Sequence, residues 1–142
     1  MTGTNNTPQF SLHHVGWITW DINIFESFWC RVLGFRQISQ SHIEKSRFKQ
    51  MFAIESEGFM RRYECNGVVI EVHFFPEETI GAAQDFNRFG INHICLLVPN
   101  KDEFLAKIPD DIQRVIYHNT GGWQNVLVRD YEGNWIELYE NM

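Results

Sequence analysis

The sequence contains an internal repeat, and this repeat restricts the folds that the chain can adopt. In each half, a histidine in a strand-like segment is followed seven residues later by a helix-capping residue and eleven residues later by a phenylalanine. The trios are His14, Asp21 and Phe25 in the first half, and His93, Asn100 and Phe104 in the second. Further along each half, a glycine precedes a glutamate by four residues: Gly67 precedes Glu71, and Gly133 precedes Glu137. The repeat predicts two copies of one module, each with a histidine on its first strand and a glutamate on its last.

Hydrophobic periodicity predicts the order of elements within the first module. Residues 12–20 are apolar and rich in β-branched and aromatic side chains, which is typical of a strand. Asp21 can cap a following helix, in which apolar residues recur at helical spacing until Gly34 marks the expected end. Three further strands are expected at residues 35–41, 47–55 and 67–75, the last after the hairpin pair Asn66-Gly67. The first half is therefore predicted as βαβββ, and the second half as a shorter copy.

Length, charge and cysteine content define the class of protein. The 142 residues suit one α+β domain at residues 10–142, with modules at about 10–75 and 90–140 and a flexible tail at 1–9. Twelve Lys and Arg against 18 Asp and Glu give a net charge of −6 without a basic run, so no nucleic-acid partner is expected. No stretch reaches the roughly 18 apolar residues of a membrane span, and the N-terminus lacks the apolar core of a signal peptide. Three cysteines without a Cys-x-x-Cys pair indicate reduced thiols. We expect a cytoplasmic protein without a membrane partner.

The repeated histidines and glutamates indicate a metal site. Because side chains alternate along a strand, Glu71 is expected on the face opposite to the apolar residues Ile70 and Val72, which should pack under helices. A carboxylate among aromatic side chains costs several kcal/mol unless it is paired or bound to a metal. Two imidazoles and two carboxylates balance a divalent cation and suit Zn, Ni, Co, Fe or Mn. The predicted ligands are His14, Glu71, His93 and Glu137.

These residues and their surroundings resemble a known family. The four positions, the segment Val32-Leu33-Gly34-Phe35 and the segment from Arg129 to Leu138 resemble the vicinal oxygen chelate superfamily over residues 12–140. This superfamily includes glyoxalase I, methylmalonyl-CoA epimerase, extradiol dioxygenases and bleomycin-resistance proteins. The resemblance implies two βαβββ modules that form a curved mixed sheet, a half-open barrel around one metal with helices on the convex face. It also implies a homodimer.

The resemblance implies a reaction but leaves its type open. We expect a metal-dependent, glyoxalase-like isomerase, epimerase or lyase that acts on a small substrate with vicinal oxygens through an enolate-type intermediate. Glu137 is the preferred catalytic base and Glu71 the second choice. One alternative is an Fe(II) extradiol-type dioxygenase with His14, His93 and Glu137 as ligands. Another is a metal-free small-molecule binding or resistance protein with an aromatic cavity.

Several further residues are expected to contact the substrate. The predicted pocket residues are Ile18, Trp20, His73, Phe75, Trp123 and Trp135. Ile18 and Phe75 stand where glyoxalase I carries the arginine and asparagine that hold glutathione, so the usual glutathione contacts are not expected. Arg61 and Arg62 are interpreted either as solvated charges or as contacts for an anionic substrate tail.

Overall fold

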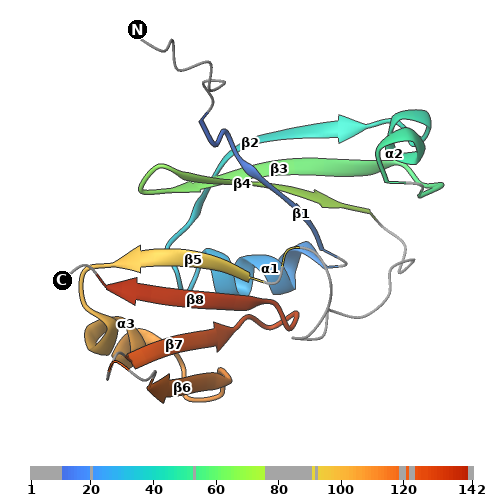
Figure 1. Ribbon diagram of the computed structural model, residues 1–142. Coiled ribbons are helices and arrows are strands. Elements are labelled where there is room, and N and C mark those ends of the chain that lie inside the picture. Colours follow the sequence, from blue (N-terminus) through green and yellow to red (C-terminus); the bar gives the residue numbers. More distant parts are fainter. Residues whose placement is uncertain are drawn as a thin grey trace, which may run out of the picture.

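The described residues of the computed structural model in Figure 1 form two four-stranded sheets with the same strand order. The structure describes residues 11–19, 21–52, 54–75, 91, 93–118, 121 and 124–140. The first sheet has the order β1-β4-β3-β2, with bounds β1 Val15–Ile18, β2 Arg36–Ile43, β3 Gly58–Cys65 and β4 Val68–Phe74. The second has the order β5-β8-β7-β6, with bounds β5 His93–Val98, β6 Arg114–His118, β7 Gln124–Arg129 and β8 Trp135–Glu140. The helices are α1 Ile22–Trp29, α2 Lys45–Phe52 and α3 Lys101–Lys107. The predicted α+β class and the paired modules are confirmed.

Strand registers show that the two modules are copies of one design. In each module the first strand runs parallel to the last, while the other neighbouring strands are antiparallel. Gly16 of β1 lies opposite Glu71 of β4. Cys95 of β5 lies opposite Glu137 of β8 in the same way. Each module therefore places its glutamate opposite the residue that follows the repeated histidine by two positions.

Local sequence signals account for the ends of the helices and the central hairpin. Asp21 caps α1, because its Oδ1 accepts a hydrogen bond from the backbone N–H of Asn23 at 2.8 Å. Asn100 caps α3 through an equivalent bond from the backbone N–H of Glu103 at 2.9 Å. Asn66, at φ 50°, and Gly67, at φ 83°, form the turn between β3 and β4, which is the conformation this residue pair favours.

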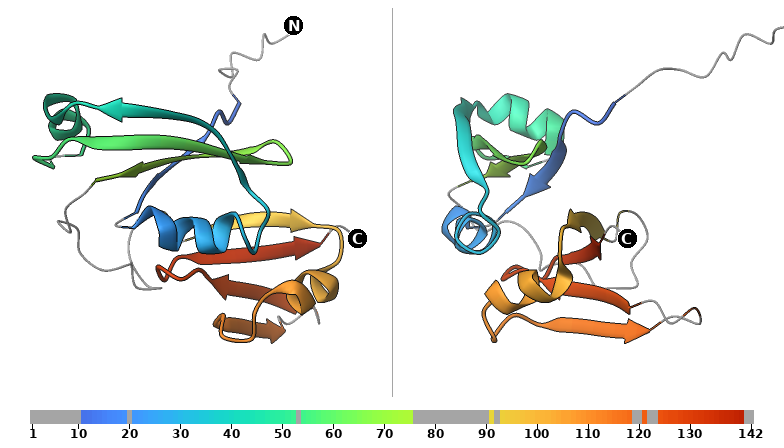
Figure 2. Two further views of the ribbon diagram at one scale, coloured as in Figure 1. Left: turned by 180° about the vertical axis from the view of Figure 1, so that it is seen from behind. Right: turned by 90° about the vertical axis from the view of Figure 1, so that its left-hand side faces the viewer.

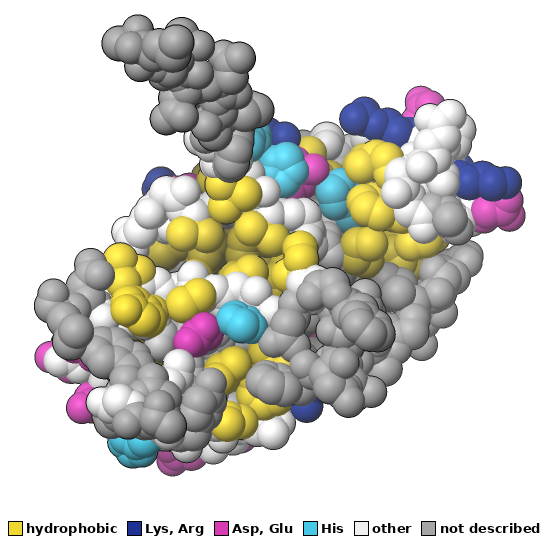
Figure 3. Space-filling view, viewed as in Figure 1, with side chains coloured by type: hydrophobic (Ala, Val, Ile, Leu, Met, Phe, Trp, Pro, Cys, Tyr) yellow, Lys and Arg dark blue, Asp and Glu magenta, His cyan; other side chains and the backbone are white. Residues whose placement is uncertain are grey.

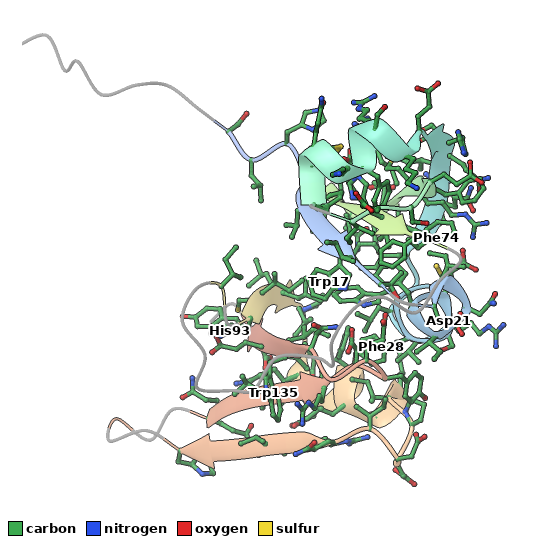
Figure 4. All side chains as sticks on the ribbon, turned by 90° about the vertical axis from the view of Figure 1, so that its right-hand side faces the viewer. Trp17, Asp21, Phe28, Phe74, His93 and Trp135 are labelled. Carbon is green, nitrogen blue, oxygen red and sulfur yellow. The ribbon has the colours of Figure 1, made fainter. Side chains whose placement is uncertain are left out.

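The apolar core joins both sheets through α1, which lies between them in Figures 1 and 2. Phe28 and Trp29 of α1 belong to one buried cluster with Ile70 and Val72 of the first sheet and Ile136 of the second. Figure 4 shows Phe28 within this region between the sheets. The predicted apolar face of β4 therefore does pack under a helix. No helix in the described ranges is long and apolar enough to cross a membrane.

Two hydrogen bonds join the first module to the turn that precedes β8. The indole Nε1 of Trp29 donates to Oδ2 of Asp130 at 3.2 Å, and Oγ1 of Thr19 donates to Oε1 of Glu132 at 2.6 Å. The Oδ1 atom of Asp130 accepts the backbone N–H groups of Glu132 and Asn134. Burial raises the pKa of Asp130, although these hydrogen bonds act in the opposite direction. The turn before the second candidate glutamate is thus fixed to α1.

The strand predicted at residues 47–55 is wrong, because this segment forms α2, and the third strand of the module is β3. Phe48 and Phe52 recur at helical spacing and contact each other, with ring centroids 5.3 Å apart. Phe48 also packs against Phe75, at a centroid distance of 5.6 Å, so α2 covers one end of the first sheet. Charged side chains obscured β3 in the sequence. Arg61 of this strand is paired with Glu26 of α1, at 2.7 Å between Nη1 and Oε1.

Candidate functional site

The first candidate pair joins the residue before β1 to the middle of β4. The Nε2 atom of His14 lies 3.8 Å from Oε1 of Glu71, whose side chain is only 12% exposed. The Nδ1 atoms of His13 and His14 are 2.8 Å apart, a hydrogen-bonding distance that leaves Nε2 of His14 facing the carboxylate. The same Oε1 atom lies 3.5 Å from Nε2 of His73. One carboxylate oxygen of Glu71 therefore faces two imidazoles.

The other oxygen of Glu71 is held by an arginine. Arg62 of β3 donates from Nε to Oε2 of Glu71 at 2.8 Å, and its Nη2 is also 2.8 Å from that oxygen. Burial raises the pKa of Glu71, but the Arg62 hydrogen bond and the electrostatic effects of the neighbouring His14, Arg62 and His73 side chains outweigh it, so the net pKa is lowered. Glu71 is therefore ionised at neutral pH.

His73 is part of the packed interior and not a surface histidine. It is 3% exposed, and its ring lies 4.8 Å from the ring of Phe52 and 6.2 Å from that of Phe48, both in α2. Burial lowers the pKa of His73, while the charge of Glu71 and the backbone of Trp17 act in the opposite direction. The neutral imidazole beside Glu71 can hold a carboxylate or a ligand in position without adding charge.

The second candidate pair joins β5 to β8. The Nε2 atom of His93 lies 3.1 Å from Oε2 of Glu137. The other carboxylate oxygen accepts a hydrogen bond from Nδ2 of Asn125 of β7 at 3.3 Å. Cys95 lies opposite Glu137, and burial, followed by the charge of Glu137, raises the pKa of its thiol. Among the described residues, no arginine contacts Glu137, which distinguishes it from Glu71.

The two pairs occupy separate places on one face of the protein. Figure 3 shows histidine and acidic side chains together over the first sheet, and again over the second. Within the described part of the chain, no group of three or more His, Cys, Asp or Glu side chains is placed to hold one ion. The donor set itself fits a divalent cation, since imidazole nitrogen and carboxylate oxygen are common ligands for Zn, Fe, Ni, Co and Mn. The structure thus brings the four predicted ligands together as two pairs and not as one set within a single chain.

The predicted pocket residues have different environments. Ile18 is 38% exposed beside the first pair, while Phe75 is buried against α2. Trp135 is buried beneath the guanidinium of Arg129, which lies 5.1 Å from its ring centroid. Figure 4 shows Trp135 and His93 on the second sheet. Trp20 and Trp123 lie outside the described residues.

Two residues around the carboxylates were not found by sequence reasoning. The sequence pattern suggests a solvated charge or an anion contact for Arg62, yet it binds Glu71 within the protein. Asn125, which donates to Glu137, carried no signal in the sequence. Both lie on strands next to the glutamate-bearing strands, so only the cross-strand register reveals them.

Comparison with known proteins identifies similar chains. A family model described as the Glyoxalase/Bleomycin resistance protein/Dioxygenase superfamily matches residues 13–124. The glyoxalase family protein from Enterococcus faecalis superposes with a TM-score of 0.71 at 15% identity, over 90% of this chain and 95% of that one. A glyoxalase family protein from Bacillus cereus gives a TM-score of 0.72 at 14% identity, over 96% and 97%. The sequence matches no curated protein.

A further similar structure contains a metal. It is a mutant of the fosfomycin resistance protein FosX from Listeria monocytogenes, complexed with Mn(II) and 1S,2S-dihydroxypropylphosphonic acid. Its TM-score is 0.61 at 17% identity, over 93% of each chain. At these identities, the superpositions show a shared fold.

Proposed function

Since the chain belongs to the Glyoxalase/Bleomycin resistance protein/Dioxygenase superfamily, we propose that it is a metal-dependent, glyoxalase-like isomerase, epimerase or lyase. Its substrate is a small molecule with vicinal oxygens. The observation that carries this proposal is the duplicated pair, in which each module sets a histidine Nε2 within 4 Å of a glutamate oxygen. The superfamily contains many enzymes, and the similar FosX structure with Mn(II) supports a divalent metal in this fold.

The proposed metal ligands are His14, Glu71, His93 and Glu137. Two neutral imidazoles and two carboxylates balance the charge of one divalent cation, and they leave coordination positions for substrate oxygens. Because the pairs lie apart in one chain, we propose that they meet across a homodimer. The first pair of one copy would then face the second pair of the other.

Exposed apolar side chains around both pairs support this dimer. Leu12 and Ile18 are exposed on either side of His14 in the sequence. Leu97 of β5 lies opposite Tyr139 of β8, and both are exposed, two residues beyond Cys95 and Glu137 respectively. A second copy placed over the two pairs would remove these side chains from water, which stabilises association.

The cation and the two glutamates have different roles in the proposed reaction. A bound divalent cation supplies Lewis-acid stabilisation of negative charge on the substrate oxygens. Glu137 removes the proton from the adjacent carbon and returns it, because among the described residues its carboxylate contacts the amide of Asn125, His93 and the thiol of Cys95 but no arginine. Glu71, which Arg62 holds, is the second choice as base.

A complementation experiment tests both the metal and the dimer. The double variants His14→Ala/Glu71→Ala and His93→Ala/Glu137→Ala each destroy one pair in every chain. We expect neither variant to bind Mn(II) alone. If the two are unfolded and refolded together, half of the dimers contain one of each, and each mixed dimer regains one intact site. The expected stoichiometry is about one quarter of the wild-type value, as twofold symmetry requires.

The outcomes of this experiment separate the alternatives. Recovery of Mn(II) binding in the mixture supports a site shared by two copies. Binding by the wild type without recovery places the site within one chain. A wild-type protein that binds neither Mn(II) nor Zn(II) contradicts the proposed function and favours the metal-free binding protein.

One observation favours a second candidate function. Arg62 engages one oxygen of Glu71, and this contact can withhold Glu71 from a metal. The remaining ligands, His14, His93 and Glu137, form the two-histidine, one-carboxylate set of Fe(II) extradiol-type dioxygenases. Oxygen uptake by the Fe(II)-loaded protein with a catechol would identify this activity.

A further inference from the structure

The two modules differ in the residue directly across the antiparallel strand pair from each glutamate. In the first sheet, Arg62 of β3 lies opposite Glu71 of β4. In the second sheet, Leu127 of β7 lies opposite Glu137 of β8. The strand that carries the glutamate pairs with its two neighbours in the same way in both modules, so the residues around the two carboxylates can be compared position by position.

We infer that Arg62 is a positioning residue that fixes Glu71 as a permanent metal ligand and leaves Glu137 as the carboxylate that can move. This inference rests on the proposed function, because it assigns separate roles to the two glutamates of that site. It adds a residue that lies outside the four proposed ligands.

The contacts of Arg62 restrict the orientation of Glu71. Two guanidinium nitrogens, Nε and Nη2, lie 2.8 Å from the same oxygen, Oε2. The carboxylate cannot rotate without breaking both contacts, so Oε1 stays directed toward the Nε2 atoms of His14 and His73. One oxygen is therefore held by the protein, and the other is presented beside a candidate ligand histidine. Partners that orient a ligating carboxylate in this way commonly strengthen metal binding.

Among the described residues, no arginine restrains Glu137, whose carboxylate contacts His93, Asn125 and the thiol of Cys95. Leu127 is buried and apolar, so it offers no hydrogen bond at the position that corresponds to Arg62. The amide of Asn125 reaches Glu137 from two residues away along β7, at the longer distance of 3.3 Å. A neutral amide binds a carboxylate less strongly than a guanidinium does. Glu137 can therefore leave its position at lower cost, as a group that accepts and returns a proton must.

Substitution of Arg62 tests the inference through Mn(II) affinity, measured by titration calorimetry on the full-length protein. We expect Arg62→Met to weaken Mn(II) binding about 10- to 100-fold. Arg62→Lys should restore only part of the affinity, because an ammonium group cannot place two donors on one oxygen in the fixed geometry of a guanidinium. Arg36→Met is the matched control, since Arg36 forms an exposed pair with Glu64 on the same sheet, at 3.6 Å. It should leave Mn(II) affinity unchanged.

A double-mutant cycle distinguishes positioning from a general structural effect. In a Glu71→Gln background, Arg62→Met should not weaken Mn(II) binding further. In a Glu137→Gln background, it should weaken Mn(II) binding by the same factor as in the wild type. Equal loss in both backgrounds, or wild-type affinity in Arg62→Met, would overturn the inference while leaving the proposed function intact. Tighter Mn(II) binding by Arg62→Met would overturn it as well and show that Arg62 withholds Glu71. If Arg62→Met fails to fold, Arg62→Lys replaces it in the same double-mutant cycle. A wild-type protein that binds neither Mn(II) nor Zn(II) removes the proposed function and the inference together.

Discussion

Replacement of Gly58 with alanine tests the close packing of α2 against the first sheet. A Cβ atom at this position would lie 2.5 Å from Cε2 of Phe48 and 2.7 Å from the carbonyl oxygen of Phe74. The Phe48 ring is buried, and the carbonyl belongs to the end of the neighbouring strand, so neither atom can move without disturbing packed structure. Overpacking of this kind costs about 1–3 kcal/mol. The lower entropy of alanine in the unfolded chain offsets about 0.4–1 kcal/mol of this.

The expected net loss for Gly58→Ala is therefore about 1–2 kcal/mol, or a fall in melting temperature of roughly 2–8 °C. Gly16→Ala is the matched control, since Gly16 is exposed in β1 and a Cβ atom there would meet nothing within 4 Å. In this variant the only expected effect is the lower entropy of the unfolded chain, so its melting temperature should stay the same or rise slightly. Differential scanning calorimetry of both variants measures the contrast. If Gly58→Ala were as stable as Gly16→Ala, the proximity of α2 to β3 would be refuted.

Two further predictions concern buried and catalytic groups. The Tyr63 hydroxyl donates to Oε1 of Glu26 at 2.5 Å, and burial is the main cause that raises the pKa of Tyr63 above its ordinary value of 10.0. The contribution of protonated Tyr63 to the free energy of unfolding is complete below about pH 10 and is lost as the pH rises above that value, because the tyrosine of the unfolded chain ionises first. Urea unfolding should therefore show a smaller fall in the free energy of unfolding between about pH 8 and pH 10.5 for Tyr63→Phe than for the wild type. Glu137→Gln should keep the wild-type circular dichroism spectrum but exchange the carbon-bound proton of a vicinal hydroxy-ketone substrate about 10²- to 10⁴-fold more slowly, as followed by NMR in D₂O. An unchanged exchange rate in Glu137→Gln would show that Glu137 is not the catalytic base. A chelator should abolish proton exchange by the wild type.

Local signals in the sequence were sufficient to predict most of the architecture. The caps at Asp21 and Asn100 and the turn at Asn66 act through their own backbone neighbours, so their effect does not depend on the rest of the fold. The repeat then predicted that both halves share one topology, and the strand orders confirm it. The first strand is shorter than predicted, because it begins at Val15 and not at residue 12.

The α2 and β3 segments were misassigned because tertiary contacts decide their structure. Phe48 and Phe52 fit a helix or a strand about equally well in a short window, and their packing against His73 and Phe75 selects the helix. In β3, Arg61 and Arg62 look like surface charges in the sequence. Their partners, Glu26 and Glu71, lie on other elements and cannot be identified from spacing along the chain.

The candidate ligand pairs could be predicted, but the difference between them could not. Each histidine and glutamate belongs to the repeat, so their spacing alone places them near each other in a parallel strand pair. The neighbours of the glutamates belong to strands β3 and β7, which the repeat does not match residue by residue. The environment of each carboxylate therefore had to come from the structure.

Duplication makes the two carboxylates directly comparable, and their neighbours differ on both sides. Next to Glu71 the parallel strand contributes Gly16, which leaves open space, while next to Glu137 it contributes the thiol of Cys95. On the antiparallel side, the charged partner of Glu71 has no counterpart beside Glu137. An anion fixed by an arginine suits a permanent ligand, whereas an anion held by neutral groups suits proton transfer. A difference in role between the two glutamates would account for the guanidinium in one module where the other carries a buried leucine. We therefore propose that this asymmetry within a symmetric scaffold separates metal binding by Glu71 from proton transfer by Glu137.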